Sequence, residues 1–150
     1  MIPRSKVVLG VGVLVAFSAI VHVLLGLDGL LTWVQTGELP DVLAPVFLLS
    51  GGALLAGLVG SYRGVIPTKP AYALGVGMMV VYLIGYADYH VLGVTEAILG
   101  IDAAGHSHGH HGSNTEILVD HLVDDFVALS SKAAEAIAAV LLAGLAVTES

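Results

Sequence analysis

Four long apolar segments constrain the fold of this chain more than any other feature. A helix needs about 20 apolar residues to cross roughly 30 Å of hydrocarbon. Segments of this kind cover about residues 7–27, 42–62, 71–93 and 128–147. Only 11% of the residues are charged, whereas a soluble domain carries about 25%. The sequence therefore predicts an all-α fold, an integral membrane four-helix bundle that forms one domain over residues 1–150.

The basic residues divide unequally between the two sides that four spans create. Arg4 and Lys6 precede the first span, and Arg63 and Lys69 lie between the second and the third. The positive-inside rule makes the side that carries them cytoplasmic. We therefore expect both termini to be cytoplasmic and the protein to lie in the plasma membrane. Ten of the twelve carboxylates and all seven histidines then lie toward the extracytoplasmic face.

Two helices are expected to run beyond the bilayer on the outer side. Ser113 and Glu116 have the spacing of a capping box, and no proline follows them before Thr148. This predicts one continuous helix of roughly 50 Å, whose first half, residues 116–127, projects from the membrane or lies along the mouth of the bundle. For residues 26–40 two alternatives remain open: a short helix lying in the outer interface, or an extension of the first span.

Small residues recur at helical spacing in the second and fourth spans. Lipid tails are as apolar as leucine, so membrane helices associate through close packing and hydrogen bonds. We expect the helices to approach one another along small residues. These are Gly52, Ala56 and Gly60, with Ala53 and Gly57, in the second span, Gly75 and Gly77 in the third, and Ala133, Ala136, Ala139 and Ala143 in the fourth.

Polar side chains inside the spans are costly and need partners. Lys132 and Glu135 are three residues apart on one helix face, so we expect them to pair with each other at a bundle or subunit interface. A proton or ion pathway is the alternative. Tyr82, Tyr86 and Tyr89 form a stripe that is expected to face the interior and to hydrogen-bond to other helices, with a redox or relay role as its alternative.

Three histidines come from three different predicted helices and reach a similar depth. They are His22, His90 and His121. Imidazole is the commonest metal ligand in proteins, so the three together predict an ordered metal site. Asp88, two residues before His90, is a further candidate ligand. Each histidine taken alone is also explained as an interior side chain bonded to a backbone carbonyl.

The fourth predicted helix carries a local pattern of metal-ligand side chains around His121. Asp120 and Asp124 are four residues apart, as are His121 and Asp125. Each pair projects from the same side of a helix on successive turns, which suits two side chains that hold one ion. A neighbouring carboxylate also orients an imidazole. The alternative is the solvated face of an amphipathic helix.

The predicted outer loop, residues 94–112, contains four histidines within six positions. These are His106, His108, His110 and His111. Clustered imidazoles bind transition metals in almost any conformation, so we expect the loop to capture metal for the ordered site. A bland polar linker and a pH-sensing loop remain as alternatives.

These features predict a protein that binds a divalent transition metal at its extracytoplasmic face, with Cu or Zn preferred and Ni or Co possible. It would act as an accessory subunit of a membrane complex, such as a copper-dependent oxidase, or as a small permease, and would assemble as a homo-oligomer or with other subunits. One alternative is a subunit that binds or anchors haem b, and another is a scaffold without a cofactor. The net charge of −7 argues against nucleic acid as a partner, and the lack of cysteine excludes thiolate sites.

Overall fold

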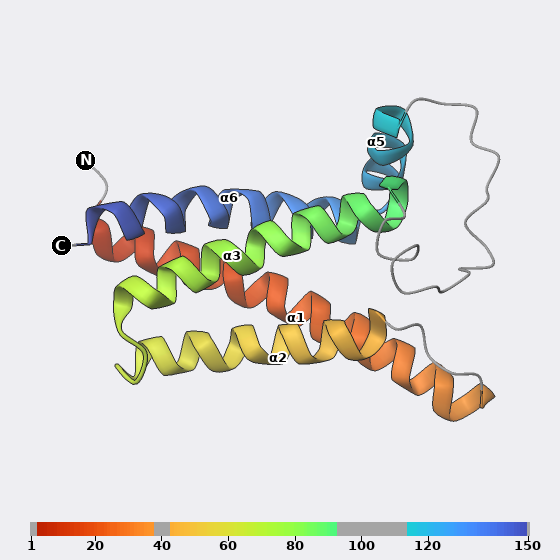
Figure 1. Ribbon diagram of the computed structural model, residues 1–150, viewed down its shortest axis with the longest axis horizontal. Coiled ribbons are helices and arrows are strands. Elements are labelled where there is room, and N and C mark those ends of the chain that lie inside the picture. The colour runs from red at the N-terminus through yellow and green to blue at the C-terminus, as the bar shows by residue number, and fades with distance from the viewer. Residues whose placement is uncertain (1–2, 38–42, 93–113, 150) are drawn as a thin grey trace.

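The computed structural model describes residues 3–37, 43–92 and 114–149, and helices dominate this part of the chain (Figure 1). Four of them are long, and two shorter helical elements lie between the third and fourth. In chain order the elements are α1 (Arg4–Thr36), α2 (Leu43–Tyr62), α3 (Thr68–Ala87), the π-helical turn η1 (Asp88–Leu92), α5 (Asn114–Asp124) and α6 (Phe126–Thr148).

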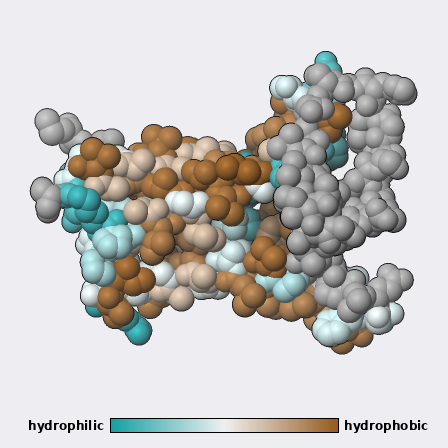
Figure 2. All heavy atoms as spheres, in the orientation of Figure 1, coloured by the Kyte–Doolittle hydropathy of each residue, from teal (hydrophilic) through white to brown (hydrophobic). Residues whose placement is uncertain are grey.

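Four helices are long and apolar enough to cross a membrane: α1, α2, α3 with the start of η1, and α6. Their outward surfaces are largely hydrophobic, as Figure 2 shows. Side chains as exposed as Leu49 (74%) and Val140 (72%) would be costly in water but not in lipid. The all-helical fold and the four apolar helices predicted from the sequence are confirmed.

The helices meet in an uneven bundle. Helix α1 packs against α2 and α6, and α3 packs against α6, whereas α2 and α3 touch far less. Both chain termini and the α2–α3 connection lie at one end of the bundle, here called the terminal end (Figure 1). Helix α5 lies at the opposite end, called the α5 end. The buried core follows α1, α3 and α6 and includes Val11, Ala19, Met79, Ala138 and Leu142.

The close approach of α1 and α2 depends on glycines. A Cβ atom on Gly26 would lie 2.6 Å from the backbone nitrogen of Leu48, and one on Gly51 would lie 2.8 Å from the carbonyl oxygen of Ala19. A Cβ on Gly52 would meet nothing within 4 Å. Small-residue packing is thus present, but the predicted series through Gly52 is one position away from the contact.

The same shift of register occurs on α6. Ala134 and Ala138 are buried, whereas Ala133 and Ala136, which belong to the predicted series, are exposed. Ala139 of the predicted series does pack against the core, so the prediction is correct only in part. An alanine-rich helix offers several equivalent small-residue series. Only the shape of the facing helices selects one of them.

The predicted continuous fourth helix is wrong, because the chain breaks at Asp125. This residue has extended backbone angles, φ −110° and ψ 103°, and its side chain accepts hydrogen bonds from the backbone nitrogens of Val127 (2.8 Å) and Ala128 (3.1 Å). An aspartate at this position is a strong N-cap, so it starts α6 afresh. Helix α5 consequently turns across the end of α6 instead of continuing its axis (Figure 1).

The open question about the end of the first span is also resolved. Helix α1 continues without a break past Gly26 and Gly29 to Thr36. It stops at Gly37, which has a left-handed φ of 73° and donates its backbone N–H to the Trp33 carbonyl at 2.8 Å. The extension of the span is therefore correct, and the separate interfacial helix is not formed.

Candidate functional site

Glu135 forms a buried ionic centre within the bundle. Its side chain is fully buried, and its carboxylate accepts hydrogen bonds from Ser18 Oγ at 3.0 Å and Ser131 Oγ at 2.9 Å. The Lys132 ammonium donates to both carboxylate oxygens, at 3.0 Å to Oε1 and 2.8 Å to Oε2. The predicted pairing of Lys132 with Glu135 is confirmed. We call these residues, together with His22, the Glu135 centre.

His22 packs against this carboxylate without hydrogen-bonding to it. Its Nδ1 donates to the Ser18 carbonyl at 2.9 Å, since a carbonyl only accepts. The ring then presents the Nε2 lone pair toward Glu135 Oε1, 3.9 Å away. One ring face stacks on Tyr82, with centroids 3.6 Å apart, and Phe47 meets the ring edge-on at 5.3 Å. His22 therefore has the surroundings of an interior histidine.

The Glu135 centre connects three helices. Ser18 and His22 come from α1, the ionic pair comes from α6, and the Lys132 ammonium also lies 5.8 Å and 5.4 Å from the ring centroids of Tyr82 and Tyr86 on α3. Opposite charges that neutralise each other reduce the cost of an ionised group inside a membrane helix. The polar atoms of the centre thus hold α1, α3 and α6 together.

Sequence reasoning missed the two serines of this centre. Ser131 precedes Glu135 by four residues, which places its hydroxyl beside the carboxylate on successive turns. That spacing is visible in the sequence. The contact with Ser18 is not visible in the sequence. Ser18 is 117 positions away in the chain, and its contact depends on how α1 meets α6.

The tyrosine stripe of α3 faces the interior, as predicted. Tyr82 is only 6% exposed, and the hydroxyl oxygens of Tyr82 and Tyr86 are both buried. The Tyr86 hydroxyl has no hydrogen-bond partner among residues 3–37, 43–92 and 114–149. The Tyr82 hydroxyl lies beside Ser50 of α2, which donates to the Phe47 carbonyl at 3.3 Å and keeps an oxygen that can accept from Tyr82.

A second polar feature lies at the α5 end, where two histidines from different elements meet. The rings of His90 in η1 and His121 in α5 have centroids 4.8 Å apart. Tyr86 and Tyr89 contact the His90 ring at 4.4 Å and 5.1 Å. The His121 Nδ1 donates to the Ile117 carbonyl at 2.8 Å. Because a carbonyl only accepts, this bond places a proton on Nδ1, and in the neutral ring Nε2 then carries the lone pair.

The structure divides the predicted ligands between these two places. His22 belongs to the Glu135 centre, and His90 and His121 form what we call the histidine pair. No three histidine or carboxylate side chains among the described residues lie close enough to hold one metal ion. The loop histidines His106, His108, His110 and His111 lie outside the described residues.

The predicted carboxylate ligands have separate locations. Asp120 and Asp124 are exposed on α5, and Asp125 caps α6. Asp88 is buried at 8% exposure where α3 passes into η1. Asp120 and Asp124 of α5 thus match the solvated-face alternative, and Asp125 has the structural role of starting α6.

The described histidines do not fit an axial role toward haem. His22 is stacked on Tyr82 on one face and approached by Glu135 at its Nε2 edge, so a porphyrin has no access to that nitrogen. The rings of His90 and His121 contact each other directly. A haem plane held between two imidazoles would have to separate them.

Comparisons with protein-family models, with curated proteins and with solved structures found no match for this chain. A functional assignment therefore rests on its own residues. The two polar features differ in what they offer: the Glu135 centre is closed and internally paired, and the histidine pair stands at the end of the bundle.

Proposed function

We propose that this chain is an integral membrane protein that binds a divalent transition metal ion at the α5 end of its bundle. His90 and His121 are the ordered ligands, and the loop histidines complete the coordination. The observation that carries this proposal is the 4.8 Å approach of the two rings from separate elements. Two imidazoles brought together in this way suit Zn²⁺ or Cu²⁺ first, and Ni²⁺ or Co²⁺ next.

The chain connectivity supports the same assignment. His90 and His121 flank residues 93–113, a segment that contains four further histidines. Since its two ends are tied to the histidine pair, the loop imidazoles stay at a high local concentration around it. By the positive-inside rule this end of the bundle faces the extracytoplasmic side.

A metal-handling or accessory role fits this geometry better than transport by the chain alone. The two charged side chains inside α6, Lys132 and Glu135, pair with each other and so are not available to conduct an ion. We therefore propose that the protein captures metal for a partner subunit or within a homo-oligomer. A permease would need a polar route past this centre.

Metal titration of untagged protein in lipid nanodiscs tests the proposal. Wild-type protein should bind Zn²⁺ or Co²⁺ stoichiometrically, and His90→Asn with His121→Asn should weaken binding by about tenfold or more, since ligating nitrogens are lost. Asp120→Asn with Asp124→Asn, on the same helix as His121, is the matched control and should leave the affinity unchanged. No stoichiometric metal in the wild type would reject the proposal and favour the cofactor-free scaffold.

Proton binding at the Glu135 centre is a second candidate function. His22 Nε2 and Glu135 Oε1 are 3.9 Å apart, and both present lone pairs in the neutral-histidine state. One proton on Nε2 would convert this contact into a charged hydrogen bond. The positive charge of Lys132 on α6 disfavours protonation of His22, whereas the face of the Tyr82 ring on α3 favours it.

Nitrogen NMR of histidine-labelled protein tests this second candidate. The Nε2 signal of His22, assigned by its loss in His22→Asn, should change with pH in wild-type protein. In Glu135→Gln the change should move to lower pH, because the carboxylate that stabilises the imidazolium is gone. A signal that stays constant across the range in which the protein remains folded would remove the candidate.

A further inference from the structure

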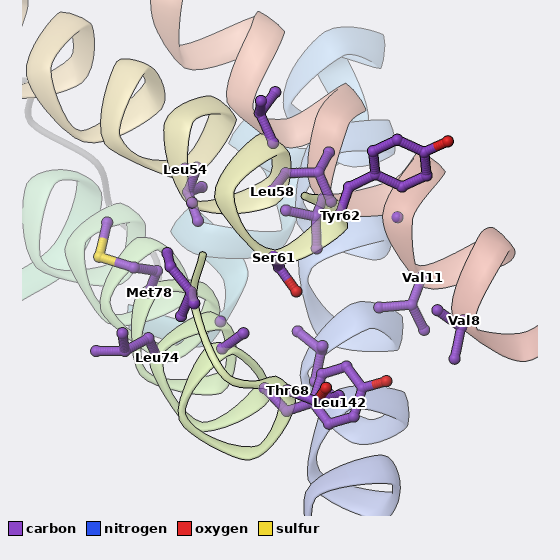
Figure 3. Close-up of a pocket in the computed structure, with 18 of the residues that line it drawn as sticks. Val8, Val11, Leu54, Leu58, Ser61, Tyr62, Thr68, Leu74, Met78 and Leu142 are labelled. Carbon is purple, nitrogen blue, oxygen red and sulfur yellow. The ribbon is translucent and has the colours of Figure 1, made fainter. Parts of the chain in front are cut away.

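A large apolar cleft lies in the half of the bundle nearest the terminal end, bordered mainly by α1, α2 and α3. Its volume is about 1190 Å³, and all four long helices contribute to its wall. Figure 3 shows apolar side chains from each of them around it, among them Val11 of α1, Leu54 of α2, Met78 of α3 and Leu142 of α6. We call it the α2–α3 cleft. Small-molecule pockets usually have volumes of roughly 300–1,000 Å³, so this cleft is larger than most of them.

The lining of the cleft is polar at one end only. Its side-chain hydroxyls come from Ser5 at the start of α1, Ser61 and Tyr62 at the end of α2, and Thr68 and Tyr72 at the start of α3. All of these positions lie toward the terminal end, whereas the wall deeper in the bundle is hydrocarbon. The cleft is thus amphipathic along its length, as a lipid molecule is.

Three exposed cations lie at the same end of the bundle as the polar part of the cleft. Lys6, Arg63 and Lys69 each follow a cleft-lining residue directly in the sequence, and all three are exposed. Arg4, the fourth cation here, is ion-paired with Glu149. The other three have no ion pair within the described part of the chain. Positive charge therefore stands at the rim where the hydroxyls begin.

We propose that the α2–α3 cleft is a binding site for one anionic phospholipid. Its acyl chains occupy the apolar part, and its phosphate headgroup lies among Lys6, Arg63, Lys69 and the rim hydroxyls. Basic residues beside a transmembrane crevice attract anionic headgroups, with a contribution of about fivefold in affinity for each Lys or Arg near the surface. Charge complementarity thus selects an anionic lipid over a zwitterionic one.

Two glycines provide a matched pair of variants. Gly57 lines the cleft, and a Cβ atom there would meet nothing within 4 Å, so a larger side chain enters the cleft without touching backbone. Gly77 on α3 is equally open but does not line the cleft. Gly57→Phe should therefore fill the site, and Gly77→Phe should add the same ring on a lipid-facing surface.

Native mass spectrometry of the full chain, released from nanodiscs of mixed phosphatidylglycerol and phosphatidylcholine, tests the proposal. Wild-type protein should retain one lipid, enriched in phosphatidylglycerol. Gly57→Phe should lose it and Gly77→Phe should keep it, with helical circular dichroism unchanged in both. Arg63→Gln and Lys69→Gln, which alter only exposed side chains, should each reduce the preference for phosphatidylglycerol by about fivefold.

Three results would overturn the proposal. The first is equal lipid retention in Gly57→Phe and Gly77→Phe, and the second is equal retention of the two lipids by wild-type protein. The third is a dimer that excludes lipid from the cleft, because the cleft would then bind a second copy of the chain. If Gly57→Phe does not fold, the two charge variants decide alone: an unchanged lipid preference in both rejects the site.

Discussion

The Glu135 centre and the histidine pair both place imidazole rings between helices, but they have opposite relations to their surroundings. At the centre, His22 lies among Ser18, Tyr82 and Glu135, and it is 3% exposed. In the pair, His90 and His121 are only half-buried, at the end of the bundle where a histidine-rich segment begins and ends. The first arrangement is closed around its ionic pair, and the second is the place where we propose that a metal ion binds.

This difference relates the surroundings of each histidine to its position along the apolar helices. A side chain deep in the bundle must be neutralised and hydrogen-bonded when the protein folds, because no water replaces a missing partner. A side chain at the end of the bundle is not under that constraint. We therefore expect substitutions at the centre to change stability, and substitutions at the pair to change metal affinity.

The largest effect on stability is expected from Lys132→Met. The change leaves the fully buried Glu135 carboxylate without its cation, which costs about 3–5 kcal/mol of unfolding free energy. Unfolding in mixed detergent, followed by circular dichroism, measures it. Lys132→Met combined with Glu135→Met removes both charges and should recover most of the loss. Equal stability of the single variant and the wild type would show that the centre is not an ionic brace.

A smaller loss of stability is expected from Ser18→Ala. This substitution removes the α1 hydrogen bond to Glu135 Oε1, and a hydrogen bond to a charged group contributes about 1.5–3 kcal/mol. The same unfolding assay applies, with Ser130→Ala as the control because the Ser130 hydroxyl bonds only to the local Val127 carbonyl. Metal affinity should not change. A loss of metal binding in Ser18→Ala would link the two regions that we describe as separate.

Asp125→Ala should affect both regions, each slightly. The loss of the N-cap costs about 1 kcal/mol, and α5 is no longer held at a fixed angle to α6. Because α5 carries His121, metal affinity should fall by a few-fold through a looser histidine pair. Asp125→Ser retains a capping side chain and should restore both properties. If Asp125→Ser restores stability but not affinity, Asp125 is itself a ligand.

The smallest change in overall stability is expected from Gly52→Ala, for which Gly26→Ala is the contrasting variant. Gly52→Ala should be neutral or slightly stabilising, since its Cβ meets nothing and alanine favours helix. Gly26→Ala places a Cβ 2.6 Å from backbone and should cost about 1–3 kcal/mol. Neither should alter the metal affinity of the distant pair. Equal effects of the two variants in thermal unfolding would place the α1–α2 contact elsewhere.

The apolar helices could be predicted from sequence because lipid imposes one simple requirement on each of them, length without charge. The Lys132–Glu135 pair could also be predicted, since both residues share one helix face. The small residues that form the helix contacts could not be predicted, because neighbouring series of alanines in α6 are chemically alike. The break at Asp125 was visible as a capping residue but was hidden by the acidic run around it.

The division of the histidines could not be predicted either. The sequence predicts that His22, His90 and His121 lie at a similar height along the bundle. It does not predict toward which neighbouring helix each side chain points. The environment of His22 depends on where α1 meets α6, and that contact is set by side chains far apart in the sequence. The meeting of His90 with His121 depends on the turn of α5, which follows from the break at Asp125.

Metal affinity of three single variants tests the central claim most directly. Co²⁺ titration, read from its visible spectrum, should be made on untagged His22→Asn, His90→Asn and His121→Asn in nanodiscs, with folding checked by circular dichroism. We predict that His90→Asn and His121→Asn weaken binding by about tenfold, while His22→Asn binds as the wild type does. Weaker binding in His22→Asn, with the other two unchanged, would contradict the account.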